Sequence, residues 1–141
     1  MNKEIVAMDN FSRFSARASL ASVGQHMRRL KIWETIECHV QIIQKVRKHK
    51  PLEKLLDAFI NILAGGHGMV EVNTRVRPDE GLQRAFGRSG CADQSVISET
   101  LNQCGEETVD QMRQAMSEIM QTHSQSIRHN YQAQCLLLMS I

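Results

Sequence analysis

The stretch PDEGLQRAFGRSGCADQSVISETLNQC, residues 78–104, carries the side chains best suited to a defined chemical task. A glutamine amide can pair with adenine through two hydrogen bonds, a serine hydroxyl can reach either type of base, and an arginine guanidinium binds phosphate. The candidate base contacts are Gln94, Ser95 and Ser98. The candidate phosphate contacts are Arg84 and Arg88. Their types and order predict contact with a DNA duplex.

These side chains need two helices and a turn to hold them at a duplex. In a helix-turn-helix, a small residue lets the two helices cross closely, and apolar anchors fix the second helix so that its first turn enters the major groove. The sequence offers Ala85 as the small residue, Ser89 and Gly90 in the turn, and Ile97 and Leu101 as anchors. The pattern therefore favours a helix-turn-helix-like hairpin.

Two features of the same stretch oppose that interpretation. The turn is one residue longer than the commonest spacing, and Asp93 and Glu99 bring negative charge close to the DNA-facing side. A plain helical hairpin in a small core would show the same apolar pattern. Both interpretations remain open from these residues alone.

The distribution of charge is uneven along the chain, although the formal net charge is only +2. Residues 1–50 hold ten Lys/Arg and four Asp/Glu, a balance of +6, whereas residues 51–141 hold seven and eleven, a balance of −4. A basic N-terminal third is suited to a phosphate-facing surface, and equally to a solvated face without a partner. Its candidate contacts, which would add a second basic surface, are Arg28, Arg29 and Lys31.

Helical spacing of apolar residues extends over most of the chain and predicts an all-α fold of about six helices. The pattern from Leu20 to Ile43 fits one long helix or two helices broken near Lys31. The charged connector KVRKHKP, residues 45–51, follows. Pro51 then opens a strongly amphipathic helix over Leu52–Leu63, which the AGGHG sequence at 64–68 is expected to end.

The second half of the chain predicts shorter helices followed by a long one. Residues 69–76 fit a helix better than a strand, because no partner strand is visible nearby. Asp79 is the expected N-cap of the next helix and Gly87 its end, and a further helix starts near Asp93. A long pattern then runs over residues 109–131, and residues 136–141 continue it or start a buried strand. Its apolar seam could also pair with a second copy of the chain.

Sites for metals, redox chemistry and membrane insertion are not indicated. The four cysteines form no close pair, and no nucleophile–base set can be argued from the spacing. Glu106, Glu107 and Asp110 begin the long helix, where acidic residues favour the helix dipole, so a metal site is the weaker explanation. The longest apolar run is too short to cross a membrane and the N-terminus has no apolar leader, so we expect a cytoplasmic protein with free thiols.

A wider stretch, LEKLLDAFINILAGGHGMVEVN…RPDEGLQRAFGRSGCADQSVISETL, resembles the N-terminal helical region of insertion-sequence DDE transposases. That region has a Leu-rich helix ending in Gly-Gly, an Arg-x-Asp…Leu…Gly pattern and a helix opened by a Ser/Gln/Ser-like string. The matching residues here are Leu52–Leu63, Gly65, Gly66, Arg77, Asp79, Leu82, Gly87, Gln94 and Ser95. The resemblance covers about residues 20–141 and is strongest over 50–104.

The resemblance implies double-stranded DNA as the partner, namely the terminal inverted repeats of a mobile element. In the family, an RNase H-like catalytic domain follows the helical region, and its first strand ends in a metal-binding Asp. The sequence CLLLMSI, residues 135–141, looks like that strand without the Asp, so no catalytic carboxylate is carried over to this chain. We therefore expect a truncated product that binds DNA without cutting it and uses no cofactor, since Mg²⁺ would be needed only by an intact catalytic domain. A homodimer, or pairing with a full-length transposase that it represses, follows from the same resemblance.

These observations divide the chain into four parts. We expect a flexible lead-in over 1–14, a basic helical segment over 15–50, a helical core with the helix-turn-helix-like hairpin over 51–104, and over 105–141 a long helix with the truncated start of a catalytic domain. Two other functions fit the same pattern: a helical protein-interaction or dimerisation module, and a stand-alone transcription regulator.

Overall fold

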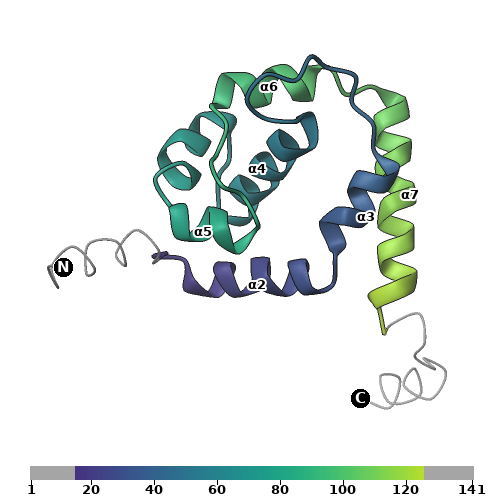
Figure 1. The fold of residues 1–141 in the computed structure, drawn as a ribbon, viewed down its shortest axis with the longest axis horizontal. Helices are drawn as coiled ribbons and strands as arrows, with labels where there is room; N and C mark the ends of the chain where they lie inside the picture. The colour runs from purple at the N-terminus through teal and green to yellow at the C-terminus, as the bar shows by residue number, and fades with distance from the viewer. Residues whose placement is uncertain (1–14, 126–141) are drawn as a thin grey trace, which may run out of the picture.

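The computed structural model describes residues 15–125, and every regular element in that range is helical (Figure 1). The predicted all-α class is therefore confirmed. The α-helices are α2 (Ala18–Arg29), α3 (Ile32–His39), α4 (Pro51–Leu63), α5 (Glu80–Ala85), α6 (Gln94–Asn102) and α7 (Glu106–His123). Two short helical turns, η1 (Met69–Glu71, 3₁₀) and η2 (Val72–Val76, π), lie between α4 and α5. The expectations for the lead-in 1–14, for the end of the long pattern beyond residue 125 and for residues 136–141 lie outside the described residues.

The chain bends sharply at Lys31, so the alternative of two helices, rather than one, is correct. Lys31 adopts a left-handed backbone conformation, with φ of 54°, directly between α2 and α3. A lysine is rarely found in that conformation, because its Cβ crowds the following carbonyl. The bend turns α3 away from α2 and toward α7 (Figure 1).

Helix α4 begins and ends as the sequence predicts. Pro51 occupies its first turn, and the Glu53 carboxylate accepts a hydrogen bond from the Lys50 backbone N–H at 2.8 Å. At the other end the chain leaves the helix through Gly65, which has φ of +82°. Gly66 follows so close to α4 that an added Cβ would lie 2.4 Å from the Asn61 amide oxygen. The glycines are therefore required by backbone geometry and by close packing.

The segment between α4 and α6 also follows the sequence. Residues 69–76 are helical, as preferred, and Val72 and Val76 are fully buried. The Asp79 carboxylate caps α5 by accepting from the Leu82 N–H at 2.9 Å, and Gly87, with φ of +82°, follows its end. Both signals of a short helix are confirmed.

Two apolar clusters hold the helices together. The larger one surrounds α4 and includes Leu56, Ile60, Val72, Val76, Leu82, Phe86 and Ile97. The smaller one joins α3 to α7 and comprises Ile36, Val40, Ala115 and Ile119. Trp33 packs against both clusters, so the α3–α7 pair, which lies along one side of the body in Figure 1, is connected to the main core at that ring.

The helix, turn and helix over residues 80–102 lie where expected, but their packing differs from the prediction. Helix α5 packs mainly against α2, whereas α6 packs against α4 and η1 (Figure 1). Buried Ala85 borders residues of α2, so the expected close crossing of α5 and α6 at Ala85 is wrong. Ile97 does anchor α6 as predicted, through the cluster around α4. Helix α7 ends at His123, and none of the helices within 15–125 has the length and apolarity needed to span a bilayer.

Candidate nucleic-acid interface

Arg88 lies inside the protein, which corrects its assignment as a phosphate contact. Only 4% of its surface is exposed, and its guanidinium donates to both carboxylate oxygens of Asp57, at 2.8 and 3.1 Å. Asp57 is fully buried and also accepts from the Ala92 N–H at 2.8 Å. The Glu53 carboxylate lies 3.4 Å from the same guanidinium. Arg88 therefore ties the turn between α5 and α6 to α4 and cannot reach a duplex.

Nearby carboxylates favour the ionised state of Arg88, whereas burial is the main factor that disfavours ionisation of His49 and Cys91. Burial opposes the guanidinium charge, but hydrogen bonds and attraction from Asp57, together with Glu53, outweigh it and raise the pKa of Arg88. Arg88 Nη2 lies 3.1 Å from His49 Nδ1, which must accept because arginine has only donors. Burial first, and then the guanidinium, lower the pKa of His49. Burial and the charge of Asp57 raise the pKa of the Cys91 thiol to about 12, so Cys91 is not a nucleophile at neutral pH.

Helix α6 presents the three predicted base contacts to different degrees. Ser95 is exposed, whereas Gln94 and Ser98 are partly buried, and none of them is enclosed in the core. The Ser95 hydroxyl donates to Asp93 at 2.9 Å, as part of the N-cap of α6. Helix α7 packs on α3, so the start of α6 is not covered by it (Figure 1). The outer side of α6 thus remains available to a partner.

The negative charge of Asp93 is largely offset where it lies. Its carboxylate accepts from the backbone and side chain of Ser95, and these hydrogen bonds are the main reason its pKa is lowered. Arg77 Nη1 also binds the second oxygen at 2.9 Å. Glu99, six residues further along the chain, is exposed and has no ion-pair partner within residues 15–125. Of the two acidic residues that opposed DNA binding in the sequence, only Glu99 is uncompensated.

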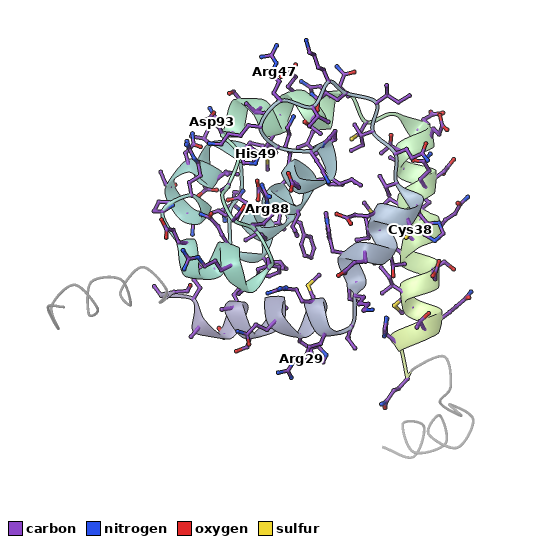
Figure 2. The ribbon with its side chains drawn as sticks, viewed as in Figure 1. Arg29, Cys38, Arg47, His49, Arg88 and Asp93 are labelled. Atoms are coloured by element: carbon purple, nitrogen blue, oxygen red, sulfur yellow. The ribbon has the colours of Figure 1, made fainter. Side chains whose placement is uncertain are left out.

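The connector at residues 45–50 lies beside α6, and sequence reasoning missed its importance. Lys45, Arg47 and Lys48 are exposed and form no ion pair within the described part of the chain. With Arg77 and α6 they line a cleft of about 550 Å³. Figure 2 shows Arg47, His49 and Asp93 around the end of the molecule that carries α6. We call this region the α6 basic face, defined by residues 45–48, Arg77 and the outer side of α6. Its only signal in the sequence was a run of four cations between two helices.

The remaining predicted contacts lie elsewhere. Arg84 is exposed and 3.7 Å from Glu80, and Arg28 donates to the Arg84 carbonyl at 3.3 Å. Arg29 projects from α2 at the end of the molecule opposite Arg47 (Figure 2), with Lys31 exposed two residues later. The second basic surface expected from the N-terminal third is therefore separate from α6, and the structure does not bring the eight predicted contacts together.

The other sites considered in the sequence can also be located among the described residues. They contain no group of three or more His, Cys, Asp or Glu side chains placed to hold a metal ion. Glu106, Glu107 and Asp110 are exposed on the first turns of α7. Cys38, Cys91 and Cys104 are free thiols.

Comparison with known proteins adds no further assignment: no family model, curated protein or solved structure gives a match.

Proposed function

We propose that this chain binds duplex DNA through the α6 basic face. The observation that carries the proposal is the position of Lys45, Arg47 and Lys48, which lie exposed next to a half-exposed helix and have no carboxylate partner among residues 15–125. Unpaired surface cations repel one another, and neutralising backbone phosphates releases counterions from DNA. Both effects make the binding of such a cluster to a polyanion favourable.

In this arrangement the cations position the protein and α6 supplies the base contacts. The segment 45–48 and Arg77 would hold phosphates on either side of a groove, while Gln94, Ser95 and Ser98 face the base edges. Partial burial of Gln94 limits its rotamers, which favours a defined hydrogen-bond geometry. The assignment of base contacts to these three residues is thereby kept, and that of phosphate contacts moves from Arg88 to residues 45–48.

A pair of charge-matched variants tests the proposal. The first changes Lys45, Arg47 and Lys48 to Gln, and the second changes the three cations of the distant surface, Arg28, Arg29 and Lys31, to Gln. Both remove three positive charges. Binding to a fluorescent duplex is measured by anisotropy between 50 and 300 mM salt, for which about 0.9 of logarithmic slope is expected per phosphate contact. The first variant should lose about 2.7 of slope, and the second should behave as the wild type. Equal losses in both variants would show that only net charge matters.

A single substitution tests whether α6 reads sequence. Binding sites are first selected from a random duplex library with the wild-type chain. Gln94→Ala should then bind the selected and scrambled duplexes more equally, because one bidentate base contact provides about 1–3 kcal/mol of discrimination. Gln25→Ala is the matched control, since Gln25 is an exposed glutamine of α2 that lies outside the α6 basic face, and its replacement should leave the sequence preference unchanged. A library that yields no preferred sequence would restrict the proposal to non-specific binding.

The wider role, as the end-binding part of an insertion-sequence transposase, is a proposal supported by the resemblance over residues 50–104 alone. It expects the coding DNA to be flanked by inverted repeats that the chain binds in preference to scrambled duplexes. It also expects no strand cleavage by this chain in the presence of Mg²⁺. Selected sites unrelated to any flanking repeat would instead favour a stand-alone transcription regulator.

A second candidate function, protein–protein interaction, is supported by the outer side of α7. Val109, Met116 and Met120 recur at helical spacing there, and each is about half exposed. This stripe lies on the helix that packs against α3, apart from the α6 basic face. Analytical ultracentrifugation of the wild type and of Met116→Gln would separate self-association through α7 from DNA binding, which Met116→Gln should leave unchanged.

A further inference from the structure

The cleft beside α6 is lined by three different parts of the chain. Residues 43–49 form one side, α6 with Arg77 forms another, and Lys54 reaches it from the first turns of α4. Its volume of about 550 Å³ is within the usual range of small-molecule sites. Most of its cationic residues are exposed, whereas Lys54 is only 4% exposed.

Lys54 is a buried ammonium group with too few partners. It donates to the Gln44 amide oxygen at 3.2 Å, and that oxygen also accepts from the Thr100 hydroxyl at 2.7 Å. An ammonium group has three N–H donors, and no carboxylate lies within ion-pair distance of Lys54 in residues 15–125. A buried charge is stabilised only when it is paired and fully hydrogen-bonded. The group is therefore suited to an anion that enters the cleft.

The charge balance of the cleft also favours an anion. Five Lys or Arg residues line it against two carboxylates, Asp93 and Glu99, a balance of +3. Asp93 is already bonded to Arg77 and to the start of α6. His49 lines the same cleft, and its Nδ1 accepts from Arg88, so its other ring nitrogen can donate a hydrogen bond to an anion.

We propose that this cleft binds one phosphate group, with the Lys54 ammonium as its buried ligand and the cations of residues 45–48 at its mouth. The inference rests on the proposed function only for the source of the phosphate, which is then the DNA backbone. A free phosphate ester of nucleotide size is the other source of the same chemistry.

Titration of the full ¹⁵N-labelled chain with sodium phosphate, at constant pH and with ionic strength balanced by NaCl, tests the site. The backbone amides of Gln44, Lys54 and Thr100 should shift together and saturate. Lys54→Met should weaken phosphate binding about tenfold or more, the loss expected for one charge-assisted hydrogen bond. The control is Lys50→Met, which removes an exposed cation outside the cleft and should leave phosphate binding unchanged.

Shifts that do not saturate, or that centre on α2 or α7, would overturn the proposal, as would an unchanged affinity in Lys54→Met. If Lys54→Met does not fold, Lys54→Arg, which keeps the charge, and the location of the shifts in the wild-type chain decide instead. The duplex and a mononucleotide are then added in separate titrations to the phosphate-loaded chain, and displacement of phosphate is measured. A duplex that displaces phosphate, with a salt slope lower by about one contact in Lys54→Met, supports the backbone as the source.

The two proposals fail in different ways. Saturable phosphate binding at Lys54 without any duplex binding would retain the site for a free phosphate ester and remove the proposed function. Duplex binding that is the same in Lys54→Met, with no response to phosphate, would retain the proposed function and remove the site.

Discussion

Replacement of Arg88 by Met separates the two roles that this residue could have. Arg88→Met removes the guanidinium from a nearly closed environment while keeping a long, flexible side chain in its place. Asp57 then loses both of its hydrogen bonds to the guanidinium and keeps the one from the Ala92 N–H. A buried carboxylate left in that state destabilises the folded chain.

The expected loss is large on the scale of a small protein. Removing one partner of a buried ion pair costs about 3–5 kcal/mol, against a total stability of about 5–15 kcal/mol for a domain of this kind. At about 4 °C per kcal/mol, the midpoint of thermal unfolding should fall by about 12–20 °C. The matched control is Arg84→Met, since the exposed Arg84 forms only a weak pair with Glu80 and its loss should cost about 0.5 kcal/mol or less.

The assay is urea unfolding of the wild type, Arg88→Met, Asp57→Asn and the double variant. Because the two side chains depend on each other, the double variant should lose at least about 2 kcal/mol less than the sum of the single losses. At a temperature where Arg88→Met remains folded, its salt slope for DNA should equal that of the wild type. An additive cycle, or a reduced salt slope in a stably folded Arg88→Met, would refute the internal role and return Arg88 to the DNA contacts.

Three further outcomes follow from single positions. The pKa of His49 is lowered in the folded chain by burial and by the neighbouring guanidinium. Its neutral ring therefore adds stability above about pH 6.5, and this stability is lost as the pH falls through the lower pKa of the folded state. Urea unfolding from pH 7.5 to 5 should show this loss, and His49→Gln should reduce the dependence of the unfolding free energy on pH. Gly24→Ala should destabilise the folded chain by about 1–3 kcal/mol, despite the better helix propensity of alanine, because the new Cβ would lie 2.7 Å from the buried Phe86 ring. Gly68→Ala is the control: it has open space around it and should leave the midpoint of thermal unfolding almost unchanged. Iodoacetamide at pH 8 should modify exposed Cys38 in the native chain and Cys91 only after unfolding, as measured by peptide mass spectrometry, and equal rates would contradict the pKa of about 12 at Cys91.

The burial of Asp57 could have been predicted from the helix pattern, but the identity of its cationic partner could not. Asp57 lies between Leu56 and Ala58 and three residues before Ile60, on the side of the amphipathic helix that faces the core. A carboxylate there requires a cation, since an unpaired buried charge is strongly unfavourable. The sequence contains many arginines, and only the folded chain brings Arg88, 31 positions away, to that carboxylate.

Local signals determined the helices themselves, because helix ends depend on residues within one turn. Pro51, the glycines of residues 64–68, the Asp79 cap and the spacing of apolar side chains each act through adjacent backbone groups, and each is confirmed. Whether residues 15–44 form one helix or two depends on the backbone of Lys31, a residue type that carries no signal for a left-handed bend. Apolar spacing alone was therefore insufficient there.

Only the tertiary structure decided which charged residues share a surface. Arg88 is buried in the core, Arg29 projects at the opposite end from α6, and the connector at 45–48 lies beside α6. Helix formation is governed by contacts a few residues apart, whereas the side of a helix that meets another is chosen by the packing of the whole core. For that reason the sequence by itself determined an all-α fold with a helix at 94–102 whose outer side is polar. The tertiary structure determined which cations lie beside that helix.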